Sequence, residues 1–137
     1  MSIEDIKQAF IENVKLRAYD DKFVDVKEEK QLLEYGINNG LSLEQSQSLL
    51  IQAAEQLDYA VESIAEKKAE EMLEQFASND GAIDKKEFFD AVSIMKRALR
   101  GKLSDQVCSI KTKQIVLSRG WKVKEGFFKG GSWFSSI

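Results

Sequence analysis

The sequence contains no histidine and no proline, and its only cysteine is Cys108. Without histidine, no side chain has an unperturbed pKa close to neutrality, so any proton transfer would fall to carboxylates or lysines. A single cysteine cannot form a disulfide within the chain, and without histidine it is a poor basis for a zinc or thiol-protease site. Without proline, no helix interior is broken by one. These absences argue against an enzyme.

Long apolar runs are also missing. No stretch of about 18 apolar residues could span a bilayer, and residues 1–5 lack the basic-then-apolar form of a secretion signal. The glycine patterns of phosphate-binding loops and of a hydrolase nucleophile elbow do not occur. We therefore expect a non-enzymatic protein located in the cytoplasm, either free or peripheral at a membrane.

Charge is distributed unevenly along the chain, although the net charge is only −3. Residues 1–101 carry 13 Lys/Arg against 21 Asp/Glu, a net −8, whereas residues 102–137 carry 7 against 2, a net +5. Such asymmetry is typical of a tail that binds an anionic partner. A tail that folds back onto its own acidic body would show the same pattern.

Apolar residues at helical spacing predict helices over residues 3–18, 26–38, 42–54, 57–76 and 85–100. Ser42 and Gln45 form a capping-box pattern at the start of the third helix. After residue 101 the pattern changes: residues 107–117 and 121–124 contain β-compatible alternation around a possible turn at residues 118–120, which predicts a β-hairpin.

The predicted fold class is therefore mainly α. We expect a duplicated helix-turn-helix bundle of about five helices over residues 1–101. Residues 102–137 would form a basic aromatic extension, hairpin-like or irregular, that either packs on the bundle or is presented to a partner. The sequence does not indicate an oligomeric state.

Two acidic turns repeat with a constant offset of 59 residues, at residues 20–28 and 79–87. Each ends in Asp-x-x-Glu, as Asp25 with Glu28 and as Asp84 with Glu87. In this pattern the Asp accepts a hydrogen bond from the third helical amide and the Glu reaches back, which is a capping box. A repeat of this length indicates a duplicated helical unit.

A calcium site is the alternative interpretation of the turns. With Glu87 at position 12 of an EF-hand loop, Gly81 and Ile83 fall at positions 6 and 8 as required, but Phe76 at position 1 offers no oxygen. In the first turn, Lys22 stands where glycine belongs. Capping explains the Asp-x-x-Glu pairs without a metal, so no cofactor is expected, while a weak Ca²⁺ or Mg²⁺ site stays open. Its candidate ligands are Asp20, Asp21, Asp25, Asp80, Asp84 and Glu87.

The order of these motifs resembles the TerB-like domains of tellurite-resistance proteins and of a membrane-anchored J-domain co-chaperone. The resemblance rests on residues 24–28, on Gly40-Leu41-Ser42 and on residues 80–87, and it covers about residues 3–101. It implies an all-helical domain with internal pseudo-symmetry, acidic clusters proposed to hold divalent metal, and a role in stress-linked assemblies near bacterial membranes. Lys22 departs from the family's usual glycine.

The C-terminal extension mixes aromatic and cationic side chains, as do membrane anchors and platforms for single-stranded nucleic acid. Self-packing on the helical body, a protein partner and a membrane surface are all compatible with it, whereas the acidic body disfavours nucleic acid. The candidate partner-binding residues are Trp121, Lys122, Lys124, Phe127, Phe128, Lys129, Trp133 and Phe134.

The sequence thus predicts a protein-interaction module of a bacterial stress-type assembly that binds a protein partner through its helical body and aromatic tail. One rival hypothesis is a divalent-metal regulator that uses the acidic turns. The other is a small membrane-associated effector or immunity protein.

Overall fold

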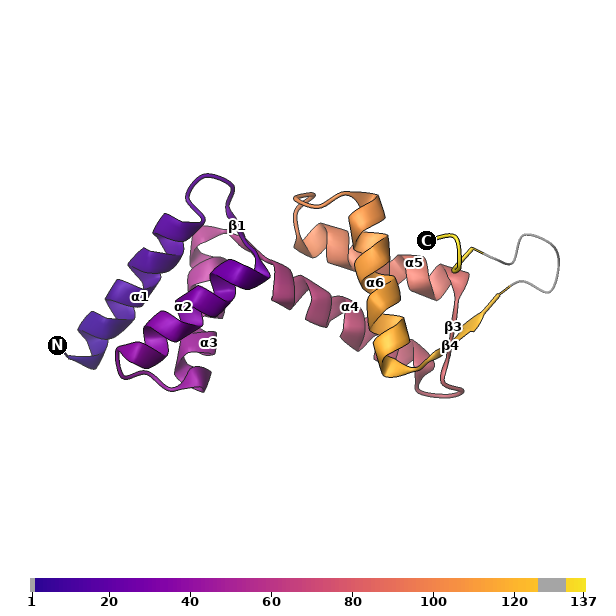
Figure 1. Ribbon diagram of the computed structural model, residues 1–137, viewed down its shortest axis with the longest axis horizontal. Helices are drawn as coiled ribbons and strands as arrows, with labels where there is room; N and C mark the ends of the chain where they lie inside the picture. The colour runs from indigo at the N-terminus through magenta and orange to yellow at the C-terminus, as the bar shows by residue number, and fades with distance from the viewer. Residues whose placement is uncertain (1, 126–132) are drawn as a thin grey trace. The chain divides into compact units, whose positions relative to one another are not determined.

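A computed structural model describes residues 2–125 and 133–137. In this part of the chain the structure is mainly helical, with six helices and four short strands, which confirms the predicted fold class. The chain divides into two compact units, Met1–Ser63 (unit 1) and Ile64–Ile137 (unit 2). Figure 1 shows the elements of both units in chain order.

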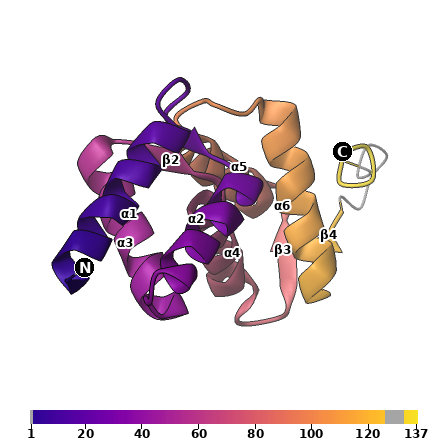
Figure 2. The ribbon, with the colours of Figure 1, turned by 60° about the vertical axis from the view of Figure 1, so that its left-hand side comes forward.

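Unit 1 contains three helices and a pair of short strands. These are α1 (Ile3–Arg17), β1 (Phe23–Val24), α2 (Val26–Asn38), α3 (Leu43–Leu57) and β2 (Ala60–Val61). The three helices pack against one another (Figure 2). β1 pairs with β2 in parallel, with Phe23 opposite Ala60. The core is formed by side chains from all three helices, among them Phe10, Leu32 and Leu50.

Unit 2 repeats this order of elements. It contains α4 (Glu62–Ala77), which begins at the last two residues of unit 1, then β3 (Ala82–Asp84), α5 (Lys85–Ala98), α6 (Asp105–Arg119) and β4 (Lys122–Lys124). α5 packs against α6, and β3 pairs with β4 in parallel. Leu73, Phe88 and Val116 are fully buried in its core.

The repeat extends well beyond the acidic turns. The carbonyl of Lys22 accepts a 2.9 Å hydrogen bond from the Ala60 amide, and the carbonyl of Gly81, 59 residues later, accepts one of the same length from Lys122. Both residues have positive φ, 55° at Lys22 and 69° at Gly81. Lys22 therefore takes the left-handed conformation that normally favours glycine, and the turn keeps its geometry in both units.

From the third helix of each unit onward the offset becomes 62 residues. Ser42 and Ser104 are the N-caps of α3 and α6, and Asp58 and Gly120 are their left-handed C-caps. One of the three extra residues lies in α5, which has 14 residues against 13 in α2, and the other two lie in the connection that follows, residues 99–104 against residues 39–42. An alignment of the two halves of the sequence at the single offset of 59 residues therefore no longer matches equivalent positions after α5.

The predicted hairpin is wrong over residues 107–117, which belong to helix α6. β-Branched residues are common in this segment, but Cys108, Thr112 and Val116, spaced by four, are all buried along one side of the helix. Intrinsic strand preference is weak beside such packing. Only residues 122–124 form a strand, and it pairs with β3 instead of with a neighbouring hairpin strand.

The divisions along the chain also differ from those expected. Residues 57–61 were expected to start a long helix, but Asp58 adopts the left-handed conformation (φ 62°) and ends α3, and β2 follows. The compact units meet after Ser63, whereas the sequence suggested a body of residues 1–101 and an extension of residues 102–137. The contacts between α5 and α6 place most of that extension within unit 2.

Candidate functional site

The Asp-x-x-Glu pairs of the two acidic turns are capping boxes, as predicted. In α2, Asp25 Oδ1 accepts a 2.7 Å hydrogen bond from the Glu28 amide, and Glu28 Oε1 accepts one of 3.1 Å from the Asp25 amide. In α5 the corresponding distances for Asp84 and Glu87 are 2.8 and 2.9 Å. These bonds satisfy amides that a helix start otherwise leaves unpaired.

The preceding aspartates shape the turns themselves. Asp21 Oδ1 accepts from the Phe23 amide at 3.1 Å, and Asp80 Oδ1 accepts from the Ala82 amide at 3.0 Å. Asp80 Oδ2 also lies 2.9 Å from Lys124 Nζ. Hydrogen bonding to Lys124 and to the Ala82 amide lowers the pKa of the Asp80 carboxyl, and Asp80 in turn raises the pKa of Lys124.

The candidate metal ligands fall into two separate turns. Asp20, Asp21 and Asp25 belong to unit 1, and the remaining three candidates belong to unit 2. Within residues 2–125 and 133–137, no three or more histidine, cysteine, aspartate or glutamate side chains are grouped as a metal would need. In the second turn the Lys124 ammonium group forms an ion pair with one carboxylate oxygen of Asp80. The geometry of both turns is that of helix starts.

The end of the chain packs on α5 of its own unit. The Trp133 ring lies 5.3 Å from Phe88 and 5.9 Å from Phe89, and the Phe134 ring lies 5.7 Å from Phe88, measured between centroids. From α6, Lys113 Nζ donates to the backbone oxygens of Phe134 and Ile137, both at 3.1 Å. The candidate partner-binding residues Trp133 and Phe134 are thus part of an intramolecular aromatic cluster.

The other tail candidates are placed differently. The Arg119 guanidinium lies over the Trp121 ring, 4.6 Å from its centroid, and also approaches Glu70 and Glu74 on α4. Lys122 and Lys124 flank the centre of strand β4. Phe127, Phe128 and Lys129 lie outside the described residues.

An apolar groove lies along the outer side of α2, and the sequence analysis did not single it out. Val26, Ile37 and Leu43 are 52%, 48% and 49% exposed, and Leu33 between them is half-buried. We call this feature, with a volume of about 370 Å³, the α2 groove. It is lined by Val26, Glu29, Lys30, Leu33, Glu34, Ile37 and Leu43.

Unit 2 provides an internal comparison for the α2 groove. The repeat offsets place Lys96 at the position of Ile37 and Asp105 at the position of Leu43. In unit 2 these two residues form a solvent-exposed ion pair, with Lys96 Nζ 2.5 Å from Asp105 Oδ1. The same surface position is therefore charged in one unit and apolar in the other. The spacing of Val26, Leu33 and Ile37 by seven and four is the sequence signal that could have revealed this stripe.

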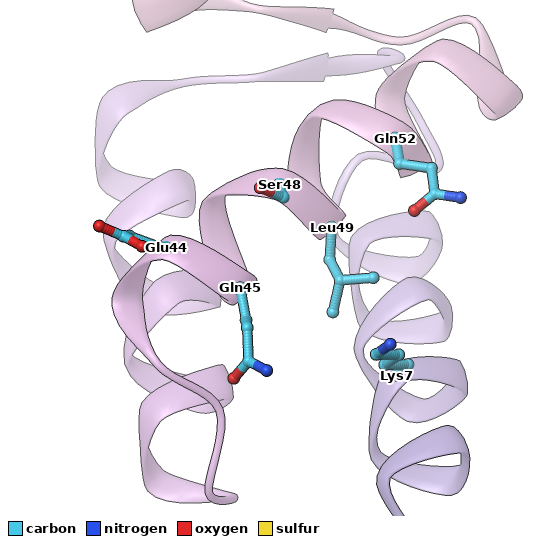
Figure 3. Close-up of a pocket in the computed structure, with 6 residues that line it drawn as sticks. All are labelled: Lys7, Glu44, Gln45, Ser48, Leu49 and Gln52. Carbon is cyan, nitrogen blue, oxygen red and sulfur yellow. The ribbon is translucent and has the colours of Figure 1, made fainter.

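A second hollow of unit 1, about 350 Å³ in volume, lies between α1 and α3. Figure 3 shows Leu49 and Gln45 of α3 directed toward Lys7 of α1, with Glu44 on the opposite side of α3. The lining mixes amide, hydroxyl and apolar groups, and Lys7 also forms an ion pair with Glu4 at 3.9 Å. This arrangement pairs no nucleophile with a base.

The lone thiol is buried inside unit 2. Burial, followed by the charge of Asp105, raises the pKa of the Cys108 thiol. A thiol that stays protonated and buried is a poor nucleophile and a poor metal ligand.

No family model, curated protein or solved structure matches this chain. Among the described residues, no helix has both the length and the apolar character required to cross a bilayer. The geometry of the two units is therefore the basis for the function proposed below.

Proposed function

We propose that this chain is a non-enzymatic protein-interaction module whose helical body presents the α2 groove to a protein partner. The aromatic tail contributes through Trp133 and Phe134, which cover part of α5 in unit 2. The resemblance to TerB-like domains supports a place in a cytoplasmic or membrane-peripheral stress assembly of a bacterium.

The exposed apolar pair Ile37 and Leu43 carries this proposal. Exposed apolar side chains are common when they are scattered, but a contiguous stripe edged by charged residues is typical of an interaction surface. The core of unit 1 is complete without this pair, since Leu32 on the inner side of α2 is fully buried. At the equivalent position, unit 2 uses the Lys96–Asp105 ion pair, so the fold itself does not require apolar residues there.

The titratable groups of the acidic turns and of Lys113 also have structural roles. The Asp-x-x-Glu carboxylates hold helix starts, Asp80 holds Lys124, and Lys113 holds the end of the chain. Because these side chains are engaged in structural hydrogen bonds and ion pairs, they support a binding role for the protein over a catalytic one. The carboxylates of the turns likewise support helix capping over a resident metal.

Site-specific photo-crosslinking in the cells that express the protein tests the proposal. A photoreactive residue replaces Ile37 in the groove, and in a matched control it replaces Leu16, which is 71% exposed and lies outside the groove. We expect a discrete adduct with another protein from position 37 and none from position 16. Equal labelling from both positions, or no adduct from position 37, contradicts the proposal.

A further inference from the structure

One end of the unit 2 surface that corresponds to the α2 groove is covered by the chain itself, whereas Lys96 and Asp105 at its other end form an exposed ion pair. Phe88 and Phe89 occupy the positions of Glu29 and Lys30, and the rings of Trp133 and Phe134 pack on them. On the neighbouring helix, Lys113 anchors the covering segment through its backbone oxygens. A short segment with two adjacent aromatic side chains therefore covers the first turns of α5 at Phe88 and Phe89.

The connectivity of the chain leaves unit 1 without such a cover. In unit 2, the chain continues beyond β4 and returns to α5 at Trp133. In unit 1, β2 ends at Val61, α4 starts at Glu62, and the unit itself ends at Ser63. Unit 1 thus has no segment of its own after β2 that could return to α2.

The charge of unit 1 indicates what could cover the groove instead. Residues 1–63 carry 6 Lys/Arg and 13 Asp/Glu, a net −7, and two of the acidic residues, Glu29 and Glu34, line the groove. Opposite charge around an apolar contact speeds association and selects the partner. The apolar end of the groove, formed by Leu33, Ile37 and Leu43, suits bulky apolar side chains.

We propose that the α2 groove binds a short segment of a partner protein that carries two adjacent bulky apolar side chains flanked by lysine or arginine. The apolar pair packs on Ile37 and Leu43, and the cations lie beside Glu29 and Glu34. The inference rests on the proposed function and adds the chemistry of the partner.

The probe is a synthetic peptide with the sequence of residues 121–137, which contains the Trp133–Phe134 pair and carries three lysines and one glutamate. It is titrated into the isotope-labelled full chain, and backbone amide shifts are followed by NMR. We expect saturable shifts along α2 and at Leu43, with a dissociation constant on the order of 10⁻⁴ M. Added salt should weaken the binding, because exposed charges are screened.

Two matched controls identify the contacts. The double variant Ile37→Lys, Leu43→Asp installs the ion pair of unit 2 in unit 1 and should lower the affinity at least about tenfold, the effect of losing a modest contact energy. A peptide with Trp133→Ser and Phe134→Ser keeps its charge and should lose affinity to a similar extent. The circular dichroism of the protein variant should match that of the wild type.

Three results would overturn the inference. The first is the absence of saturable shifts up to about 1 mM peptide, the limit of weak specific binding. The second is a set of shifts confined to α5 and α6, which would show that the peptide only exchanges with the protein's own covering segment. The third is self-association of the protein alone that the double variant abolishes, which would assign the groove to a second copy. An adduct from position 37 in cells together with any of these results would leave the proposed function standing and remove only the assigned chemistry.

Discussion

Gly36 of α2 lies so close to Ser46 of α3 that a Cβ at position 36 would overlap the Ser46 hydroxyl and lie 3.0 Å from the Ser46 Cβ. The Ser46 hydroxyl is buried, and it has no hydrogen-bond partner within the described part of the chain. The contact between α2 and α3 therefore depends on the missing side chain at position 36. This contact fixes the inner side of α2 against α3, whereas the α2 groove lies on its outer side.

Gly36→Ala should destabilise the protein by about 1–3 kcal/mol, because overpacking outweighs the gain in helix propensity. Ser46→Ala should be neutral or stabilising by about 1 kcal/mol, since it removes a buried hydroxyl that has no partner. The loss caused by Gly36→Ala should be smaller in the Ser46→Ala background than in the wild type, beyond the sum of the two single effects. Urea denaturation measures all three; additive effects in the double variant would show that the two residues do not meet.

The capping interpretation of the acidic turns predicts a difference between two substitutions of Asp84. Asp84→Ala should lower the free energy of unfolding by about 1 kcal/mol, whereas Asp84→Asn should remain close to the wild type, because asparagine caps a helix nearly as well as aspartate. Millimolar Ca²⁺ or Mg²⁺ should leave the unfolding temperature of all three proteins unchanged. A metal-dependent rise in the wild type that is lost in Asp84→Asn would instead establish a metal site.

The Asp80–Lys124 contact predicts a dependence of stability on pH. Because the folded-state pKa of Asp80 lies below its ordinary value of 3.8, its contribution is complete above that pH and disappears as the pH falls through the lowered value. Asp80→Asn keeps the acceptor for the Ala82 amide and loses only the ion pair. Its unfolding temperature should be lower than that of the wild type at neutral pH, and the difference should disappear as the pH falls through the lowered pKa of Asp80.

Lys124→Met should show the same pH profile as Asp80→Asn. A difference from the wild type that persists unchanged at low pH would mean that these residues act through packing instead of charge. Thermal unfolding followed by circular dichroism is sufficient for this series.

The cover on α5 depends on Lys113, which bonds two backbone oxygens of the covering segment. Lys113→Met keeps the aliphatic stem and removes the donors, so the near-ultraviolet circular dichroism from the aromatic cluster should weaken. The free energy of unfolding should fall by about 1 kcal/mol, as expected for a partly exposed charged hydrogen bond. Lys102→Met, at an exposed position, serves as the control and should change neither quantity; an unchanged aromatic signal in Lys113→Met would contradict the anchoring role.

The features that could be predicted from the sequence are those set by residues close together in the chain. The capping boxes involve residues three apart, so Asp25 with Glu28 and Asp84 with Glu87 could be read from spacing alone. Helix α6 was missed because its buried line of Cys108, Thr112 and Val116 is set by packing against other elements, while its β-branched content favours a strand.

The α2 groove was missed for a different reason. An apolar stripe in a sequence does not indicate which side of a helix will be buried. The structure distinguishes the two sides, because Leu32 lies in the core whereas Ile37 and Leu43 lie at the surface. The contrast with Lys96 and Asp105 depends on the change of offset from 59 to 62 residues, which a single constant spacing hides.

The central claim is that the apolar character of the α2 groove serves a partner and not the fold of unit 1. Its most direct test is the free energy of unfolding of the Ile37→Lys, Leu43→Asp double variant, measured in urea beside the wild type. We expect a change within about 0.5 kcal/mol, as for ordinary surface substitutions. A loss of about 2 kcal/mol or more would place Ile37 and Leu43 in the stabilising core and contradict the claim.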